Sequence, residues 1–426
     1  MTPALDTVVV GNGAAAAEAV LALRASGYGG RVDLFADGDL PPYNPMLGTY
    51  YVAGELTRAE CFPFGDAGFY AANGVEAHLS APVTQLAPGE RSLVTADGSR
   101  FSYRQCLLAT GASAAVPPVA GLAGPGVLTL RSFPDAVRLC GAVVAARVRA
   151  ATGSAPPRAV VLGASFAGLE VARVLHGLGL DVAVVEREPS VLPRVAHAAA
   201  AAAVARRLRA LGVDLRLGAE VRAAARAGER LALEVAGGRL AADFVVVCTG
   251  TRPNLGLLEG SGLAAGGGVD VDERMRTAAP GLLAAGDVAR TLDPVTGERT
   301  VVALWSSARR QGRAAGLTLA GADACCPGGV PCNIQHVADT LFASGGSYAA
   351  ADRVDVDERD GSVAALGFLG SRLVGFNLFG DVRRAGPLAR ALGHAPSDLA
   401  ASGCLSAPVA LAAVREGITW KTRNAG

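Results

Sequence analysis

Two glycine-rich segments have the spacing that holds the pyrophosphate of a dinucleotide. The first follows a short β-branched run, Thr7–Val10, and places Gly11, Gly13 and Ala16 in a G-x-G-x-x-A pattern. The first glycine permits a tight turn, the second lets a pyrophosphate approach the backbone, and the small third residue lets helix and strand pack closely. Asp37, just past a second predicted strand, can accept hydrogen bonds from a ribose. This context favours a dinucleotide site over a tight turn in an ordinary βαβ unit.

The pattern occurs again in the second quarter of the chain. Gly163, Ser165 and Gly168 have the same spacing after the predicted strand Ala159–Leu162. Ser165 departs from glycine at the middle position, but it is small. One such unit would fit a simple dehydrogenase. Two units in one chain predict two dinucleotides, a flavin and a nicotinamide nucleotide.

The acid that follows the second unit bears on the choice of nicotinamide nucleotide. Glu186 ends the next predicted strand, where a carboxylate would bind the adenosine ribose 2′-hydroxyl and repel a 2′-phosphate. NADH is therefore favoured over NADPH. Arg187 stands next to it, so NADPH stays open as an alternative.

Composition limits the class of protein. The chain has 426 residues, of which 51% are hydrophobic and 18% charged, so two to three domains with a large core are expected. The net charge of +1 argues against nucleic acid or an acidic membrane surface as the main partner. No basic segment precedes the first predicted strand, and the apolar runs are too short to span a bilayer, so a cytoplasmic protein is expected.

The cysteines do not form a recognisable ligand pattern. The eight cysteines contain no Cys-x-x-Cys pair, which argues against a disulfide scaffold or a zinc site. Cys325, Cys326 and Cys332 could form a metal or redox cluster, but surplus cysteines in a Gly/Pro loop are the preferred interpretation. No bound metal is expected. His176 is interpreted as a helix-surface residue.

Periodicity and turn residues place these motifs on an alternation of strands and helices. Arginines in 205–230 are interpreted as a solvated helix face. Helices are expected at Phe133–Ala150, Ala198–Leu211 and Ser306–Ala320. Strands are expected at Thr7–Val10, Val32–Phe35, Val75–His78, Val83–Leu86, Leu93–Thr95, Arg100–Cys106, Cys106–Ala109, Ala159–Leu162, Val213–Leu217, Leu231–Val235, Phe244–Cys248, Leu282–Ala285, Ala364–Leu369 and Arg372–Asn377.

The order of the short motifs resembles one family. After the first glycine turn come Ala109-Thr110-Gly111, the second turn, Thr249-Gly250 and Gly286-Asp287. This order is similar to the pyridine nucleotide–disulfide oxidoreductase superfamily, in its ferredoxin/rubredoxin reductase and NADH oxidase branch. The resemblance covers about residues 5–320. The tail, with NIQHVADTLFASGG and LVGFNLFGDVRRAGPLARAL, is similar to the dimer-forming interface domain of that branch.

The resemblance implies an α/β fold with two Rossmann-like dinucleotide-binding domains, as in glutathione reductase, and a C-terminal α+β interface domain. The implied FAD domain is 1–118 with 245–322, the NAD(P) domain 119–244, and the interface domain 323–426. The resemblance also implies a homodimer, the form usual in that branch. His336, in the tail of this chain, could be a cross-subunit proton donor, although a structural role is preferred.

By resemblance, further residues approach the two cofactors. Asp287 is similar to the acid that binds the ribityl hydroxyl of FAD, and Val83 to a residue of the adenine region. Phe166 is similar to the aromatic residue that gates the nicotinamide slot, and Glu170 to the acid near the nicotinamide carboxamide. The remaining cofactor-binding positions implied are Ala14, Ala109, Thr110, Gly111, Gly250 and Gly286.

One departure from the family concerns the thiol. Members that reduce disulfides carry Cys-x-x-x-x-Cys on the first helix after the FAD ribose site, and relatives acting on coenzyme A disulfide or oxygen keep one cysteine there. Here the stretch Tyr43–Gly54 has none, and Cys61 comes several positions too late. A thiol relay is therefore not expected. Thr49, Tyr50 and Trp305, with Tyr43, are the residues expected nearest the electron acceptor.

The sequence therefore predicts an FAD-dependent NAD(P)H oxidoreductase. It would pass hydride from NADH to FAD, and electrons onward to an electron-carrier protein or a small molecule. An enzyme that acts directly on one small organic substrate is the first alternative, because residues 43–51 are rich in tyrosine and uncharged. A non-enzymatic, redox-sensing flavoprotein is the second.

Overall fold

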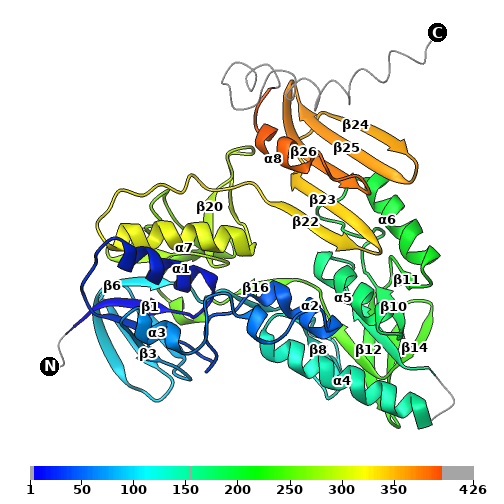
Figure 1. Ribbon diagram of the computed structural model, residues 1–426, viewed down its shortest axis with the longest axis horizontal. Helices are drawn as coiled ribbons and strands as arrows, with labels where there is room; N and C mark the ends of the chain where they lie inside the picture. Colours follow the sequence, from blue (N-terminus) through cyan, green and yellow to red (C-terminus); the bar gives the residue numbers. More distant parts are fainter. Residues whose placement is uncertain (1–3, 153–155, 396–426) are drawn as a thin grey trace. The chain divides into compact units, whose positions relative to one another are not determined.

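The computed structural model describes residues 4–152 and 156–395. Over these residues the chain divides into two compact units, one made of 4–113 with 251–329 and the other of 114–250 with 330–395. Each unit consists of two separate segments of the chain, because the chain leaves the first unit after residue 113 and returns to it at residue 251 (Figure 1). The three-domain division expected from the sequence remains a prediction.

Within its described residues, the first unit contains a seven-stranded sheet of order β3-β2-β1-β6-β5-β4, with β19 paired to β6. The β1, β2, β3, β6 and β19 strands run parallel, and β4 and β5 add an antiparallel extension. Central parallel strands are covered on both faces, which is why β1 needs a continuous apolar run such as Val8–Val10. The strands are β1 (Leu5–Val10), β2 (Val32–Phe35), β3 (Val75–His78), β4 (Val83–Ala87), β5 (Ser92–Thr95), β6 (Arg100–Leu108) and β19 (Leu282–Ala284).

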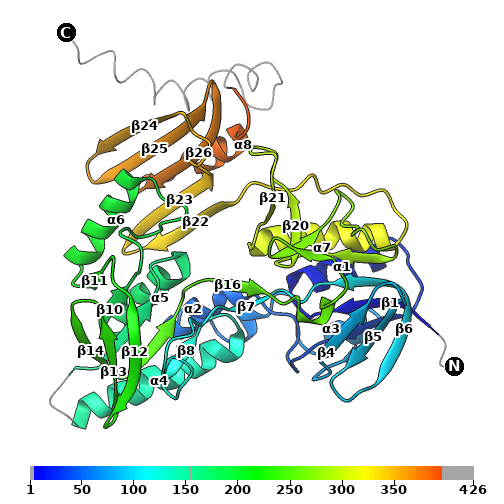
Figure 2. The ribbon, with the colours of Figure 1, turned by 180° about the vertical axis from the view of Figure 1, so that it is seen from behind.

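Two helices that are far apart in the chain pack side by side in this unit. They are α1 (Ala14–Ala25) and α7 (Trp305–Leu319), and both views show them in contact (Figures 1 and 2). A Cβ atom at Gly312 or at Gly316 would lie 2.2 Å from a backbone oxygen of α1. The two glycines, four residues apart on one helix face, therefore allow the helix backbones to approach.

Shorter elements complete the first unit. They include two α-helices, three 3₁₀ turns, and a four-stranded sheet of order β17-β18-β20-β21 among the residues described. Two short strands, β7 (Ala112–Ala114) and β16 (Thr251–Pro253), pair with each other. The others are η1 (Pro45–Leu47), α2 (Gly48–Ala53), η2 (Ala59–Cys61), α3 (Gly68–Ala72), η3 (Gly256–Leu258), β17 (Ala264–Ala265), β18 (Gly268–Asp270), β20 (Ala289–Leu292) and β21 (Arg299–Val301).

The second unit contains a parallel sheet of order β11-β10-β9-β15-β8 in its described residues. The segment between β11 and β15 forms a three-stranded antiparallel sheet, β12-β13-β14. Its elements are β8 (Val127–Thr129), α4 (Phe133–Thr152), β9 (Arg158–Leu162), α5 (Phe166–Gly177), β10 (Asp181–Val185), α6 (Ala198–Ala210), β11 (Asp214–Arg216), β12 (Val221–Ala227), β13 (Arg230–Val235), β14 (Gly238–Ala242) and β15 (Phe244–Val247).

The same unit includes an antiparallel sheet of order β22-β23-β26-β25-β24. Helix α6 packs on β25 and β26, and the fully buried Asn377 joins this sheet to the loop before α6. Its Oδ1 accepts from the His197 backbone N–H at 2.6 Å, and its Nδ2 donates to the Val195 carbonyl at 3.0 Å. The elements are β22 (Cys332–Val337), β23 (Thr340–Gly346), β24 (Arg353–Arg359), β25 (Ser362–Leu369), β26 (Arg372–Phe379) and α8 (Ala385–Ala391).

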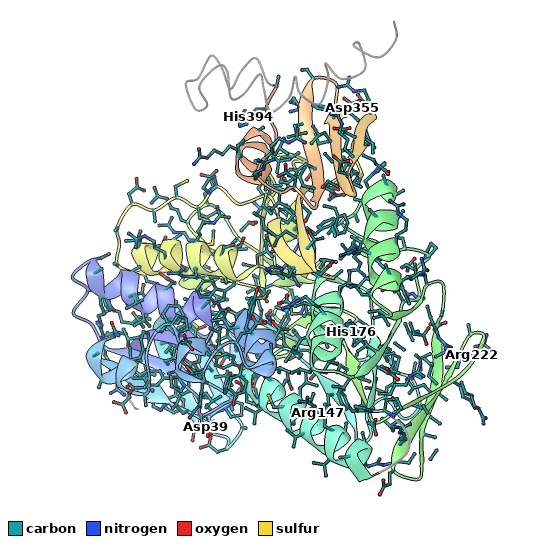
Figure 3. The ribbon with its side chains drawn as sticks, turned by 45° about the vertical axis from the view of Figure 1, so that its right-hand side comes forward. Asp39, Arg147, His176, Arg222, Asp355 and His394 are labelled. Atoms are coloured by element: carbon teal, nitrogen blue, oxygen red, sulfur yellow. The ribbon has the colours of Figure 1, made fainter. Side chains whose placement is uncertain are left out.

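The α/β fold class is confirmed, and the structure corrects three predicted details. The segments expected as two strands between Arg100 and Ala109 form one strand, β6. The arginine-rich stretch 205–230 is not one helix face: Arg222 and Arg226 lie on β12, and Figure 3 labels Arg222 on that hairpin. Among the strands that were not predicted are β22, β23 and β24, which contain residues that are depleted in strands: Asn in β22, Ala and Gly in β23, and Asp in β24.

None of the helices in the described ranges combines the length and the hydropathy needed to cross a membrane.

Candidate functional site

In the first unit, parallel strands end together at one edge of the sheet. The register aligns Val10 with Phe35 and Leu108, and Leu108 with Ala284. Ligands of open parallel sheets bind at the carboxyl ends of the strands. The predicted FAD residues that follow these strand ends, and so emerge at this edge, are Gly11, Asp37, Ala109 and Gly286.

The first glycine turn has the geometry that a pyrophosphate needs. Gly11 has a φ of +113°, and a Cβ atom there would lie 2.2 Å from the Ala109 carbonyl oxygen. Gly13 is the N-cap of α1, and a Cβ atom at Gly13 would have no non-neighbouring described atom within 4 Å. No side chain caps the first turn of α1. The backbone amides at the start of α1 therefore fit an anionic phosphate group. The buried Ala14 and Ala16 lie in this first turn.

Asn12, between the two glycines, was missed by the sequence reasoning. Its Nδ2 donates to the Leu40 carbonyl at 2.8 Å and to the Tyr70 hydroxyl at 2.7 Å. Its Oδ1 is buried and accepts no hydrogen bond from the described residues. Burial raises the pKa of Tyr70, which keeps that hydroxyl protonated. A buried acceptor lacking a donor is costly, so Asn12 fits a ligand that offers a hydroxyl or an N–H.

Asp37 and Val83 flank the same edge of the sheet. Asp37 is exposed one residue after Ala36, as an acceptor for a ribose requires. The Ala81 N–H donates to the Ala36 carbonyl at 2.8 Å, which brings the start of β4 close to this segment. Val83, half-buried two residues further on, thus lies near Asp37, where the resemblance puts the adenine region.

The turn after β19 is held by a residue that was not predicted. Gly286 has a φ of +82°, and its N–H donates to the buried Gln311 Oε1 at 2.8 Å. Gly286 also approaches α1, since a Cβ atom there would lie 3.2 Å from that of Ala15. Asp287 follows directly and is buried. Gln311 therefore fixes the backbone that presents Asp287.

Asn254 likewise fixes the segment after β6. The Thr110 hydroxyl donates to the Asn254 carbonyl at 2.8 Å, and Asn254 Nδ2 donates back to the Thr110 carbonyl at 2.9 Å. The Asn254 N–H donates to the Gly111 carbonyl at 2.9 Å. Sequence spacing gave no signal for this asparagine, because it lies more than a hundred residues away in the chain.

In the second unit, Leu162, Val185 and Val247 end their strands in register. Gly163 follows with a φ of +101°, and a Cβ atom there would lie 2.6 Å from the Cys248 carbonyl oxygen. A Cβ atom at Gly168 would lie 2.0 Å from the Gly163 carbonyl oxygen. Both positions therefore require glycine, as in a dinucleotide turn.

Ser165 explains the departure from glycine at the middle position. It is the N-cap of α5: its Oγ accepts from the Gly168 N–H at 3.4 Å and donates to the Cys248 carbonyl at 3.0 Å. The serine therefore ties the helix start to the segment after β15. In that segment Gly250 has a φ of +115°, and its carbonyl accepts from the Ala115 N–H at 2.9 Å.

Glu186 is oriented by the backbone. Its carboxylate accepts from the Ala164 N–H at 2.7 Å and from the Glu188 N–H at 2.9 Å. The exposed Arg187 forms an ion pair with Glu188 at 3.2 Å. Arg187, because of which NADPH stayed open as an alternative, is thus paired with Glu188 and not with Glu186. This arrangement fits a ribose hydroxyl at Glu186.

The first turn of α5 presents two further predicted residues. Phe166 is half-buried, and its ring centroid lies 5.6 Å from that of Phe342 on β23, edge to face. Glu170, four residues further along the helix, is 4% exposed, and its carboxylate accepts from Gln335 Nε2 on β22. The sequence reasoning identified Phe166 and Glu170 but missed Gln335.

Two aromatic pairs, each with an arginine against one ring, lie in the first unit. The Trp305 ring lies 6.4 Å from Phe64, and the Arg309 guanidinium lies 4.6 Å from the centre of the Trp305 ring. The Tyr43 ring lies 5.7 Å from Phe62, and Arg58 covers Phe62 at 5.4 Å. Of the other residues expected near the acceptor, Thr49 is buried in α2 and Tyr50 is half-buried.

Among the described cysteines and histidines outside these motifs are Cys61, Cys325, His176 and His336. Cys61 is fully buried, and burial raises the pKa of its thiol. The Cys325 thiol is exposed and donates to Glu273 at 3.4 Å. No group of three metal-ligating side chains occurs in the described residues. His176 is half-buried on α5 (Figure 3), and His336 is exposed on β22.

Comparison with known proteins connects these features. Residues 5–312 match the family of pyridine nucleotide-disulphide oxidoreductases. The chain is 32% identical, over 83% of both chains, to the epsilon subunit of NADH-dependent phenylglyoxylate dehydrogenase of Aromatoleum evansii. It is 34% identical to rubredoxin-NAD(+) reductase of Ectopseudomonas oleovorans, covering 68% of this chain and 73% of the relative.

A solved structure agrees. The ferredoxin reductase for the CYP199A2 system of Rhodopseudomonas palustris superposes with a TM-score of 0.78 at 27% identity, covering 88% of this chain and 91% of that one. The family match, over residues 5–312, spans both glycine turns and the strands that carry them. The chain therefore belongs to the pyridine nucleotide-disulphide oxidoreductase family and is an FAD-dependent NAD(P)H oxidoreductase.

Proposed function

We propose that this chain oxidises NADH and delivers the electrons to an electron-carrier protein, with FAD as cofactor and no thiol relay. The observation that carries the proposal is a complete dinucleotide turn in each unit, one at Gly11 and one at Gly163. A single turn would support only a dehydrogenase.

The residues proposed to hold FAD all belong to the first unit. The α1 amides beyond Gly13 would bind the pyrophosphate, Asp37 a ribose, and Asp287 a ribityl hydroxyl. Asn12 Oδ1 would accept a hydrogen bond from the bound group. When bound, FAD supplies the exchange between two-electron and one-electron chemistry, and the protein supplies orientation and exclusion of water.

The residues proposed to hold NADH all belong to the second unit. The turn from Gly163 to Gly168 would bind the pyrophosphate, and Glu186 the adenosine ribose. Phe166 and Glu170 would contact the nicotinamide, the first by covering its slot and the second by binding the carboxamide. Support comes from their position on the first turn of the helix that the glycine turn opens.

The arginines of the two aromatic pairs support a protein acceptor. Arg309 over Trp305 and Arg58 over Phe62 place positive charge beside aromatic rings. The Arg309 side chain keeps 45% of its surface exposed while it pairs with Glu18. Surface cations steer an acidic partner, and the rubredoxin-NAD(+) reductase relative is named for such a carrier. A small organic substrate would not need these charges.

An acceptor comparison tests this proposal. The holoenzyme is supplied with NADH and with rubredoxin, a [2Fe–2S] ferredoxin or a small quinone, at low and high salt. We expect reduction of one of the carrier proteins that weakens as salt rises. Salt-independent reduction of the quinone alone would contradict a protein acceptor.

A second candidate function is supported by the extent of one match. The relative that matches over 83% of both chains is a subunit of an NADH-dependent phenylglyoxylate dehydrogenase. The chain could accordingly serve as the nicotinamide-linked subunit of a larger dehydrogenase and receive its electrons from a partner subunit. Co-purification with dehydrogenase subunits from the native host, and NAD⁺ reduction by that assembly, would distinguish this function.

The absence of a thiol relay yields a direct prediction. Cys61→Ser is expected to keep kcat for NADH-dependent carrier reduction within about twofold of wild type, because a buried thiol of raised pKa supplies little thiolate. Steady-state assays of carrier reduction measure kcat, with Cys325→Ser as the exposed-thiol control. A fall of a hundredfold or more in Cys61→Ser alone, with FAD still bound, would restore a thiol to the mechanism.

Glu186 yields a prediction on nucleotide choice. Glu186→Ser is expected to raise KM for NADH roughly tenfold, the cost of losing hydrogen bonds to a charged group, and to lower KM for NADPH because the repelling carboxylate is gone. The ratio of the two kcat/KM values measures the effect. The same change at an exposed acid of the second unit, Glu220→Ser, serves as control. An unchanged ratio in Glu186→Ser would remove the ribose role.

A homodimer and a cytoplasmic location are further parts of the proposal. The dimer would form through the sheet of strands β22 to β26, called here the C-terminal sheet. Ile334 and Val356, on the two edge strands of this sheet, expose 55% and 42% of their surface. The cysteines of the described residues are all free thiols, as in a reducing compartment. Light scattering of the purified chain and fractionation of native cells test the two statements.

A further inference from the structure

The C-terminal sheet contacts the first turn of α5 at two points. Gln335 on β22 pairs in register with Phe342 on β23. Gln335 reaches the carboxylate of Glu170, and the ring of Phe342 packs against Phe166. The views in Figures 1 and 2 agree in placing α5 beside β22 and β23.

The hydrogen bonds of Gln335 span one helical turn. Its Nε2 donates to the Phe166 carbonyl at 2.9 Å and also to Glu170 Oε2. Positions four apart lie one above the other on the same helix face, so a single amide can bind the backbone of one residue and the side chain of the other. Gln335 is 8% exposed as a residue, so water competes little for either hydrogen bond.

The orientation of this amide is itself fixed. Gln335 Oε1 accepts from Asn333 Nδ2 at 3.2 Å. Gln335 alternates with the exposed Ile334 and His336, so strand geometry directs its side chain to the interior while theirs face outward. A buried polar side chain with donors and acceptor all engaged is suited to holding a partner in place.

We propose that Gln335 is a positioning residue for the nicotinamide site: it holds the Glu170 carboxylate in the orientation that binds the carboxamide. The proposal rests on the role of Glu170 given under the proposed function. It assigns to the C-terminal sheet a part in nucleotide binding, in addition to any part in assembly. Gln335 itself is not assigned a contact with the nucleotide.

Binding of two nucleotides to the oxidised holoenzyme tests this. NAD⁺ carries the nicotinamide, whereas ADP-ribose shares its adenosine, pyrophosphate and second ribose but lacks that ring. Gln335→Met, which keeps the length of the side chain but has no donor, is expected to weaken NAD⁺ roughly tenfold or more and to leave ADP-ribose unchanged. Calorimetric titration gives both dissociation constants without turnover.

A purely structural role would affect both nucleotides alike or neither. The same Gln→Met change at the exposed Gln85 of the first unit is the matched control. Equal loss of NAD⁺ and ADP-ribose in Gln335→Met would overturn the proposal, as would no loss.

A third variant separates the two proposals. Glu170→Gln should weaken NAD⁺ but not ADP-ribose, and adding Gln335→Met to it should cost little more, because both changes remove one interaction. If Glu170→Gln has no effect on NAD⁺, the proposed role of Glu170 fails. If Glu170→Gln weakens NAD⁺ and Gln335→Met does not, only the positioning inference fails.

Discussion

Gly13→Val is expected to give a folded protein that does not retain FAD. The backbone of Gly13 is extended, with a φ of −88°, so valine fits its conformation, and a Cβ atom there meets no non-neighbouring described atom within 4 Å. The new side chain would instead fill the space that the α1 amides face. We therefore expect FAD affinity to fall by roughly 100-fold or more with little change in the stability of the apoprotein.

The measurement is the flavin absorbance that stays with the purified protein, together with the Tm of apoprotein prepared from wild type and variant. Gly29→Val is the matched control, because Gly29 also has ordinary φ and open space around its Cβ position. If Gly13→Val protein keeps wild-type FAD content, the first glycine turn is not the pyrophosphate site.

Gly168→Ala is expected to give a yellow protein that NADH does not reduce. A Cβ atom at Gly168 would lie 2.0 Å from the Gly163 carbonyl oxygen, so the start of α5 has to move away from the turn after β9. The clash lies in the second unit, whereas the residues proposed to hold FAD lie in the first. A displacement of this size at a positioning turn lowers the rate of reduction by about 100-fold or more, so no reduction is expected within the time in which NADH reduces wild type.

Anaerobic mixing separates the outcomes for this variant. Flavin absorbance should persist with NADH and disappear with dithionite, which needs no nucleotide site. Gly177→Ala, on the same helix, has open space at its Cβ position and should behave as wild type. Reduction of Gly168→Ala by NADH at the wild-type rate would contradict a nucleotide site at the second turn.

The parts of the site that lie next to each other in the chain were predictable from the sequence. The turns at Gly11 and Gly163 follow buried strands at a fixed spacing, and the structure gives a steric reason for glycine at both. Ser165, which replaces the middle glycine of the second turn, could be predicted to be tolerated but could not be explained from the sequence. Its smallness was visible in the sequence, whereas its role as helix cap depends on the Cys248 carbonyl, far away in the chain.

The supporting residues were not predictable, because each acts through a distant segment. Asn254 holds Thr110, Gln311 holds Gly286, and Gln335 holds Glu170, and none of these pairs has a local spacing rule. Asn12 occupies a position that the motif leaves open to any residue. The strands β22 to β24 were missed for a different reason: they pair in hairpins with the next strand of the chain, although they contain residues of low strand propensity.

The central claim is that NADH reduces the FAD of this chain directly. The most direct test is anaerobic rapid mixing of NADH with purified holoenzyme whose accessible thiols have been alkylated. We expect a yellow protein whose flavin absorbance is lost, after mixing with NADH, within the time of one catalytic turnover. The rate of this loss should be the same before and after alkylation. Protein that takes up no flavin, or bound FAD that NADH leaves oxidised, would contradict it.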